Sequence, residues 1–338
     1  MIDMDKQSIQ NNALSFLKNQ NKPVTTLEIH KHIQQTVSER TLRRWLADWQ
    51  AQGLVERLGN KRGTRYQYRP QSVEPKLTFL QNIPKHRRQA LIHQIRDVWT
   101  HTSTALEGNT FTLGDTSILL EQGLTISGKP IKEHQEILGH AKAIDLIYQF
   151  VSQNQPMDKA FVSRLHLAVQ TEDVLDIYKP MGDWKVEPNG TNAVDEHDQP
   201  VYIEYAHPLD VEALMNELME TLNDIKTEAV TPDNAPHIYA KLHMGFVHIH
   251  PFWDGNGRLA RLIANIPLLK AGLPPLVIDQ TQRVEYIRAI ADYQIKTGKL
   301  TSQTGVWPDN TNYQWFERFC QNCYKLTQQL IDEAKQAR

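Results

Sequence analysis

The twelve residues from His250 to Arg261, HPFWDGNGRLAR, constrain the fold more than any other stretch of the 338-residue chain. Gly255, Asn256 and Gly257 come directly before a run whose apolar residues recur at the spacing of one helix face. This pattern predicts a glycine loop that opens into a helix. Free backbone N–H groups and the positive end of the helix dipole gather at such a start, so the segment is expected to bind an anion.

The charged side chains around this loop point to phosphate chemistry. Arg258 and Arg261 lie three residues apart, so they project from one side of the predicted helix, where the dipole disfavours cations unless an anion is nearby. Asp254 offers a hard oxygen ligand where a phosphate-bound Mg²⁺ would need one, since such ions take one or two protein carboxylates. His250 can take a proton near neutral pH, and Pro251 biases it away from helical geometry. The segment therefore predicts a nucleotide site that contains a base.

The residues of this segment are open to two other interpretations. A simple connection with solvated arginines would not explain why the base, the carboxylate, the glycines and the arginines occur together. A metal cluster of His243, His248 and His250 is disfavoured because the i, i+5 spacing separates the first two around a helix. His243 and His248 are expected to be packing or polar helix residues, and Phe252 is expected to anchor the loop in the core.

The string resembles the signature of Fic-domain proteins, H-x-F-x-D/E-G-N-G-R-x-x-R, and every specified position is present. The stretch 102–112, TSTALEGNTFT, is similar to the family's inhibitory helix, S/T-x-x-x-E-G/N, with Ser103 and Glu107 at the marked positions. The segments 129–147 and 201–217 resemble the family's helices and its flap. The resemblance covers most of the chain from residue 77 to about residue 304.

The chain departs from the family pattern at one position. Lys185, in the run Gly182, Asp183, Trp184, Lys185, stands where relatives often carry an arginine after the aromatic residue. The chain therefore lacks the residue that usually makes this contact in the family.

The resemblance implies adenylylation of a protein hydroxyl. A Fic enzyme binds ATP with Mg²⁺, and a Tyr, Thr or Ser side chain of the target attacks the α-phosphate and releases pyrophosphate. The family pattern assigns these roles: His250 is the base, Asp254 the Mg²⁺ ligand, Gly255, Asn256 and Gly257 the α- and β-phosphate cradle, Arg258 a contact of the phosphate chain, and Arg261 the contact of the γ-phosphate. This agrees with the residue-level prediction, since such catalysis is mostly positioning and charge neutralisation.

Glu107 has a physical peculiarity of its own. If residues 103–107 are helical, Gly108 and Asn109 are natural stop residues, which leaves the carboxylate at the negative end of the dipole, where it needs a cation. A solvated helix-end glutamate is the alternative. The resemblance implies that Glu107, together with Ser103, inhibits the enzyme by pairing with Arg261, so the chain is expected to be largely self-inhibited.

The segment near residues 201–206 has a β-rich composition. The resemblance implies that it is the flap that aligns the target by strand addition, through Val201, Tyr202, Ile203 and Tyr205. An ordinary hairpin is the alternative.

The N-terminal residues form a second unit. Apolar spacing predicts a helix that ends before Pro23, Thr25 and Glu28 have the spacing of a capping box, a third helix is expected over 38–52, and 54–68 is typical of a hairpin. Three helices and a basic hairpin resemble a winged helix-turn-helix. Residues 1–70 hold 12 Lys and Arg against 6 Asp and Glu, whereas the remainder holds 25 against 33.

A basic recognition helix with a basic wing fits DNA binding. Protein contacts with solvated arginines are the alternative. The candidate DNA contacts are Arg40, Arg43, Arg44, Lys61 and Arg62.

The predicted fold class is mainly α: a helical Fic-domain bundle with a small β-hairpin flap, plus an N-terminal winged helix-turn-helix domain of α+β type. The expected domains are a winged helix-turn-helix at 1–70, a linker at 71–76, a helical region at 77–150 with the inhibitory helix at about 100–109, a Fic core at 151–304 with the flap at about 201–206 and the active-site loop at 250–261, and a C-terminal helical segment at 305–338.

The remaining features narrow the class of protein. Cys320 and Cys323 form a lone CxxC without a second pair, which favours spare thiols over zinc. The polar N-terminus lacks the apolar core of a signal peptide, and polar residues and prolines interrupt the most apolar stretch, 262–278, so a cytoplasmic protein without membrane spans is expected.

Several functional alternatives stay open. The chain could be a DNA-binding transcriptional regulator that uses the Fic domain as a nucleotide sensor. The same site could instead remove AMP from modified targets, or transfer phosphate or another nucleotide. A homodimer is compatible with the sequence, which leaves the oligomeric state open.

Overall fold

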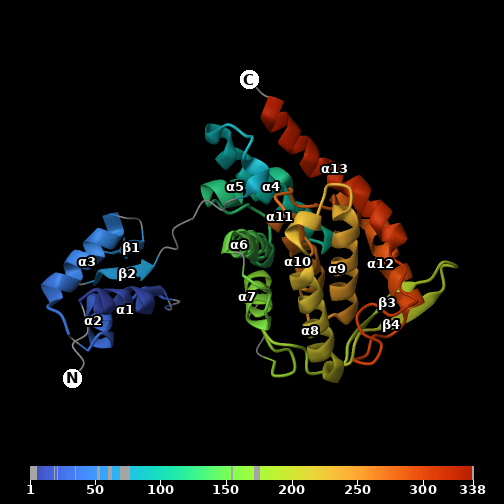
Figure 1. The fold of residues 1–338 in the computed structure, drawn as a ribbon, viewed down its shortest axis with the longest axis horizontal. Coiled ribbons are helices and arrows are strands. Elements are labelled where there is room, and N and C mark those ends of the chain that lie inside the picture. Colours follow the sequence, from blue (N-terminus) through green and yellow to red (C-terminus); the bar gives the residue numbers. More distant parts are fainter. Residues whose placement is uncertain are drawn as a thin grey trace. The chain divides into compact units, whose positions relative to one another are not determined.

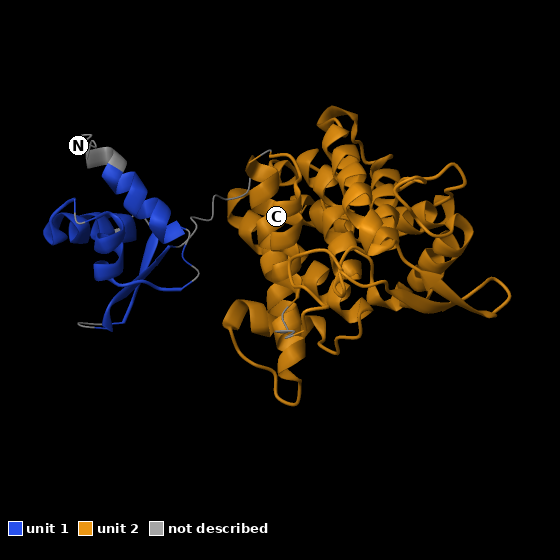
Figure 2. Cartoon of the chain, turned by 90° about the horizontal axis from the view of Figure 1, so that it is seen from below, with its two compact units in different colours: residues 1–74 blue, residues 75–338 orange. Residues whose placement is uncertain are grey.

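The computed structural model describes residues 6–18, 20, 22–34, 36–51, 54–59, 63–68, 77–153, 155–170 and 176–336. Contacts between Cα atoms divide the chain into two compact units, Met1–Glu74 and Pro75–Arg338, coloured blue and orange in Figure 2. Each unit has its own hydrophobic core.

Unit 1 consists of α1 (Lys6–Lys18), α2 (Thr26–His32), α3 (Glu39–Ala51), β1 (Val55–Leu58) and β2 (Arg65–Tyr68). The predicted capping box is confirmed: Glu28 N–H donates to Thr25 Oγ1 at 3.3 Å, and Thr25 N–H donates to Glu28 Oε2 at 2.6 Å. The strands pair as an antiparallel hairpin, with Val55 opposite Tyr68. Two predicted features, the Lys61 and Arg62 contacts and the linker at 71–76, lie outside the described residues.

Unit 2 is almost entirely helical, as the sequence predicts, with one two-stranded hairpin (Figure 1). Its elements are α4 (Lys85–Leu106), α5 (Leu113–Gln122), α6 (Ile131–Gln153), α7 (Lys159–Val169), β3 (Gly190–Val194), β4 (Pro200–Glu204), α8 (Pro208–Asp224), α9 (Ala235–Ile249), α10 (Asn256–Ile263), α11 (Ile266–Lys270), α12 (Arg283–Thr297) and α13 (Gln314–Gln336), with short 3-10 turns at Thr78–Leu80, Thr227–Ala229 and Gln280–Gln282.

The centre of unit 2 is α9, which packs against α8, α10, α11, α12 and α13. A helix covered on this many sides must be apolar around most of its circumference. Tyr239, Leu242 and Phe246 are accordingly buried, and together with α10 they belong to the main hydrophobic core. The turn from α9 into α10, which contains the glycine loop, is therefore held between two helices that pack in the core.

The hairpin pairs β3 with β4 antiparallel, from Gly190 opposite Glu204 to Val194 opposite Pro200, and it packs on α12. A Cβ at Gly190 would lie 2.4 Å from the Ile203 carbonyl oxygen, so only glycine fits there. Within the described residues, each strand has β partners on one side only, which leaves an edge open to another strand.

Among the described residues, no helix is both long enough and apolar enough to cross a bilayer. The two cysteines of α13, Cys320 and Cys323, are buried free thiols, and burial raises their pKa values.

Candidate active site

The loop between α9 and α10 is held by its own side chains. Phe252 is fully buried, as predicted, and stacks on the His166 ring with a centroid distance of 3.9 Å. The Asn256 side chain clamps the loop, since its Oδ1 accepts from Phe252 N–H at 3.0 Å and its Nδ2 donates to Phe252 O at 2.8 Å. Gly255 adopts φ +78°, a left-handed conformation that favours glycine. Because the Asn256 side chain is occupied, only its backbone N–H is free to meet a phosphate.

His250 lies just past the end of α9 in a left-handed conformation, with φ 52° and ψ 60°. Its Nδ1 lies 3.3 Å from the Val247 carbonyl oxygen, and its ring stacks on Tyr205 at 3.7 Å with 3° between the planes. Burial, with the positive charge of Lys185 as a further cause, lowers the pKa of His250 to about 3. The imidazole is therefore neutral near pH 7. A carbonyl can only accept, so Nδ1 carries the proton and Nε2 is left as a base.

The first arginine of α10 is fixed at the mouth of the site. Arg258 Nη1 donates to the Val169 carbonyl at 2.9 Å, and its Nη2 lies 3.5 Å from Asp254 Oδ2. The Arg258 side chain is buried, and its Nε has no partner among the described residues. The Asp254 side chain is 62% exposed, so its carboxylate is free to bind a cation.

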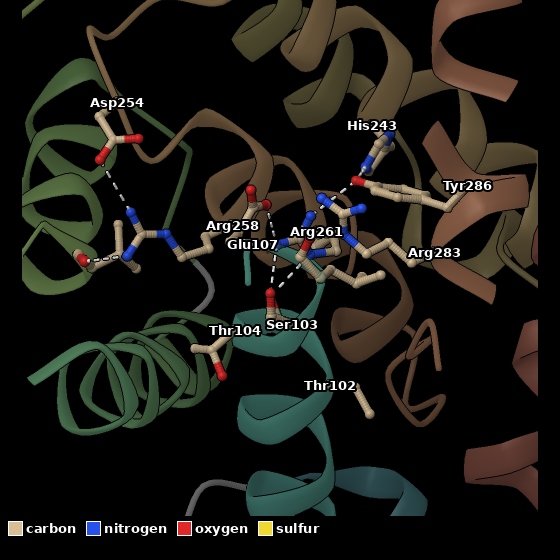
Figure 3. A network of polar contacts seen from close by, with 12 residues as sticks. Thr102, Ser103, Thr104, Glu107, His243, Asp254, Arg258, Arg261, Arg283 and Tyr286 are labelled. Carbon is tan, nitrogen blue, oxygen red and sulfur yellow. Dashed lines mark hydrogen bonds and ion pairs between the residues drawn. The ribbon is translucent and has the colours of Figure 1, made fainter. Parts of the chain in front are cut away.

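The second arginine is the centre of a polar network, shown in Figure 3. Arg261 Nε donates to Ser103 Oγ at 2.9 Å, Nη2 donates to Ser103 O at 2.8 Å and to Glu107 Oε1 at 2.7 Å, and Nη1 donates to Tyr286 OH at 2.9 Å. Burial opposes the charge, but Tyr286 and Glu107 raise the pKa of Arg261. The structure thus brings Ser103 and Glu107, which are neighbours on one helix, together with Arg261, which is far from both in sequence.

The Glu107 carboxylate lies against the start of α10. The helix that carries it, α4, ends at Leu106, with Glu107 as C-cap and Gly108 at φ +103°. It is much longer than the inhibitory helix expected at about 100–109, because its N-terminal part packs in the core. A Cβ at Gly257 would lie 2.4 Å from Glu107 Oε1, so the carboxylate reaches the N-terminal turn of α10. An anion at this position is favoured by the helix dipole.

Two residues of this network were missed by the sequence analysis. Tyr286 OH lies 3.0 Å from His243 Nε2, and Arg283 Nε donates to the Leu106 carbonyl at 2.8 Å, at the C-terminal end of α4. Both residues lie on α12, outside any recognisable motif, and only their i, i+3 spacing on one helix could have suggested a shared face. His243 is the buried polar helix residue that the sequence indicates.

The predicted flap residues fall into different environments. Val201, Tyr202 and Ile203 lie in β4, where Tyr202 is exposed and Ile203 is buried. Tyr205 differs from the prediction, because it lies beyond the strand and its N–H donates to the Asn189 carbonyl at 3.1 Å. That N–H is not available for an added strand, and the ring supports His250 instead.

The candidate DNA contacts of unit 1 that the structure describes are on α3. Arg40, Arg43 and Arg44 are all exposed, and Arg43 pairs with Glu39 at 2.6 Å.

The donor set of the site fits one kind of metal. In the described part of the chain, no group of three or more His, Cys, Asp or Glu side chains could hold an ion by itself. Asp254 supplies an exposed carboxylate beside the anion-binding turn, and the other carboxylate there, that of Glu107, is paired with Arg261. This suits Mg²⁺, which binds through one or two carboxylates and completes its shell with phosphate oxygens and water.

Fold and site together define a class of protein: a helical bundle in which a neutral histidine stands beside an anion-binding helix N-terminus. Residues 156–268 match the Fic/DOC family, and this segment contains the loop between α9 and α10. The chain is therefore a Fic-domain protein.

Relatives with this domain occur in animals. The chain is 32% identical over 236 residues to a protein adenylyltransferase Fic of Drosophila willistoni, covering 68% of this chain and 40% of the relative. It is 30% identical over 198 residues to protein adenylyltransferase fic-1 of Caenorhabditis briggsae, covering 57% of this chain and 36% of the relative. The chain thus spans only about two fifths of the length of these curated relatives.

Solved structures share the fold. A Fic domain containing signaling protein from Bacteroides thetaiotaomicron matches with a TM-score of 0.66 and 26% identity, over 78% of this chain and 95% of that chain. A fragment of Fic-1 from C. elegans matches with a TM-score of 0.58 and 19% identity, over 98% of this chain and 84% of that chain. The second likeness concerns the fold alone.

Proposed function

We propose that this chain is a protein adenylyltransferase, which transfers AMP from ATP to a Tyr, Thr or Ser hydroxyl of a target protein or of itself. The observation that carries the proposal is the position of His250, whose Nε2 is a free base beside the anion-binding start of α10. The names of the relatives, which are called protein adenylyltransferases, support the same reaction.

In this reaction the target hydroxyl gives its proton to His250 Nε2, and its oxygen attacks the α-phosphorus of ATP. A new P–O bond forms to the target as the bond between the α-phosphorus and the bridging α–β oxygen breaks, and pyrophosphate leaves. The backbone N–H groups of Asn256 and Gly257 and the guanidinium of Arg258 stabilise the charge on the phosphates. Positioning and charge neutralisation provide most of the catalysis.

Asp254 is the proposed ligand of Mg²⁺, on the basis of its exposed carboxylate. When bound, the ion supplies positive charge to the phosphate chain. The weak contact with Arg258, at 3.5 Å, orients the carboxylate without occupying it.

The proposed target-docking element is β4, whose open edge accepts an extended target segment through backbone hydrogen bonds. Tyr202 is exposed on β4, whereas Val201 is half-buried, because successive residues of a strand point to opposite faces. Ile203 and Tyr205 belong to one buried hydrophobic cluster, and the Tyr205 ring stacks on His250.

We further propose that Glu107 keeps the enzyme inactive. Its carboxylate occupies the guanidinium of Arg261 and reaches the N-terminal turn of α10, where an ATP phosphate would otherwise bind. Glu107 and the γ-phosphate are then competitors for one cation, with Ser103 holding Arg261 in both states.

The test is adenylylation with labelled ATP in a lysate, followed by mass spectrometry of labelled proteins. Glu107→Gly is expected to raise transfer by roughly tenfold or more, because it removes a charge-assisted bond to a buried cation. His250→Ala in the same background is expected to abolish transfer while ATP binding stays measurable.

Glu285→Gly is the matched control, since it also replaces an exposed glutamate of the same unit by glycine. If Glu107→Gly and wild type transfer AMP equally, the inhibitory role is wrong. If the His250→Ala variant still transfers AMP, His250 is not the base.

A second candidate function belongs to unit 1. Its three helices and hairpin, with Arg40, Arg43 and Arg44 exposed on α3, support DNA binding by a winged helix-turn-helix. A homodimer and a cytoplasmic location stay predictions.

A further inference from the structure

A buried lysine, Lys185, lies beside His250, and the proposed transfer reaction does not use it. The side chain of Lys185 is almost completely buried, with 2% of the residue exposed. Its ammonium group donates to Asn189 Oδ1 at 2.7 Å and to the Ile249 carbonyl at 3.4 Å. Its backbone N–H donates to the Pro251 carbonyl at 2.8 Å. Lys185 thus contacts the chain on both sides of His250.

The same contacts continue into the flap. Asn189, the acceptor of the ammonium group, precedes β3 and accepts Tyr205 N–H at its own carbonyl. Tyr205 follows β4 and stacks on His250. The ammonium group also lies 5.7 Å from the centroid of the Tyr205 ring. Together these contacts join the two ends of the hairpin, before β3 and after β4, to the loop that carries His250.

Based on this geometry, we propose that Lys185 is a positioning residue of the transfer reaction. Its charged amine ties the ends of the flap, before β3 and after β4, to the His250 loop. This inference rests on the proposed adenylyltransferase function for its kinetic consequences. The tie itself is a structural claim that does not need the activity. A neutral amine would lose the charge-assisted character of both side-chain contacts, so the flap and the base would be held less firmly.

The groups that face Lys185 explain why its charge is easily lost. Burial is the main cause, with the positive charge of Lys299 next, and together they lower the pKa of Lys185 to about 7, although Glu204 acts in the opposite direction. Lys299 and Glu204 form an ion pair with each other, so Glu204 is only a partial counter-ion for Lys185. His250 stays neutral near pH 7, and so does Tyr205, because burial raises the pKa of Tyr205 to about 12.

The sign of the pH dependence follows directly. Below its pKa the amine is charged and the tie is present; as the pH rises through neutrality, the proton is lost and the tie weakens. Activity is therefore expected to fall on the alkaline side. An arginine at this position would keep its charge over the whole range, and a methionine would lack it throughout.

The kinetic test uses the full chain in the Glu107→Gly background and measures kcat/KM for ATP from about pH 6 to about pH 9, since this ratio reports the ionisations of the free enzyme. The parent is expected to lose activity with an apparent pKa near that of Lys185. Lys185→Arg is expected to remove this alkaline decline, and Lys185→Met to give a flat profile about tenfold lower. An unchanged alkaline decline in Lys185→Arg would overturn the proposal.

A second measurement keeps the test independent of the enzymatic activity. With ¹³C-labelled lysine, NMR is expected to show one ε-carbon that titrates near neutral pH and is absent in Lys185→Arg. Limited proteolysis of the hairpin is expected to accelerate above that pH in the wild-type chain but not in Lys185→Arg. If the hairpin of Lys185→Met resists protease as well as the hairpin of the wild-type chain does below neutral pH, the tie is absent and the proposal is wrong.

The outcomes separate the two proposals. If no variant transfers AMP, the proposed function fails, and NMR and proteolysis still decide the role of Lys185. If the Lys185 variants do not fold, Asn189→Ala removes the 2.7 Å acceptor while leaving the lysine in place. This variant is expected to expose the hairpin to protease at all pH values, and a protease-resistant hairpin would contradict the tie.

Discussion

At the scale of single residues, the site is organised around Arg261, which is 3% exposed and has partners on every side. Ser103 and Tyr286 occupy two edges of the guanidinium, and Glu107 occupies the third position. Only the glutamate is substantially exposed, at 44%. The exchange of this one partner for a phosphate therefore needs no movement of the arginine.

Tyr286 is expected to hold Arg261 in the orientation that ATP requires. Tyr286→Phe keeps the ring but removes the hydroxyl that accepts from Arg261 and contacts His243. In the Glu107→Gly background, KM for ATP is expected to rise about tenfold with kcat little changed, because the guanidinium that binds substrate loses a hydrogen bond that orients it.

Steady-state kinetics with labelled ATP measure this effect. Tyr324→Phe is the control, since Tyr324 is also buried and donates to a carbonyl, that of Pro274, but does not contact Arg261. Equal KM values in the two variants would show that Tyr286 does not orient the arginine.

The residues of the site differ in how well the sequence predicts them. The loop from His250 to Arg261 is predictable because chain connectivity places its members together, and Glu107 is predictable because a carboxylate at a helix C-terminus needs a cation. Tyr286 and Arg283 are not predictable, because only the packing of α12 on α4 and α9 brings them to the site. The occupied side chain of Asn256 was missed for the same reason, since a motif does not specify the direction of a side chain.

At the scale of elements, the proposed inhibitory segment is the end of α4, a 22-residue helix whose middle lies in the core through Leu91, Ile95 and Trp99. Arg283 of α12 donates to the Leu106 carbonyl, one of the carbonyls that have no partner within the helix. This contact fixes the last turn of α4 and so fixes the position of Glu107. The proposed inhibition would therefore depend on a contact outside the Glu107–Arg261 pair.

Arg283→Ala is expected to loosen the last turn of α4 and to raise basal adenylylation, by less than Glu107→Gly does, because the inhibitory carboxylate is still present. Hydrogen–deuterium exchange at residues 103–107 is expected to accelerate in the same variant. Arg288→Ala, which removes an exposed arginine of the same helix, is the control. A rise in activity without faster exchange would assign another role to Arg283.

Elements were more predictable than their ends. The capping box of α2 and the helix of α3 follow from local sequence, because caps and apolar spacing act over a few residues. The length of α4 and the position of Tyr205 beyond β4 depend on tertiary packing, which no local pattern reports.

At the scale of the whole molecule, the chain joins a basic unit to an acidic one, since residues 1–70 carry 12 Lys and Arg against 6 Asp and Glu and the remainder carries 25 against 33. A near-neutral total therefore conceals two surfaces of opposite charge. This division favours contacts of unit 1 with a polyanion.

For DNA, the expected behaviour is binding that weakens as the salt concentration rises. Replacement of Arg40, Arg43 and Arg44 by Ala is expected to reduce the slope of log K against log salt by about 2 to 3, since each phosphate contact contributes about 0.9. Gel shifts with promoter DNA measure this slope. The control replaces three exposed arginines of unit 2, Arg164, Arg288 and Arg318. No binding by the wild-type chain at low salt would exclude the DNA proposal.

The contrast between a buried Arg261 and a half-exposed Glu107 has a consequence for how the enzyme would respond to its substrate. An inhibitor that is part of the chain acts as a tethered competitor, whose effective concentration is set by the stiffness of α4 and not by how much protein is present. Dilution cannot remove it, and every molecule carries one copy. Whatever bends or pulls the end of α4 would therefore change the apparent affinity for ATP without touching the nucleotide site.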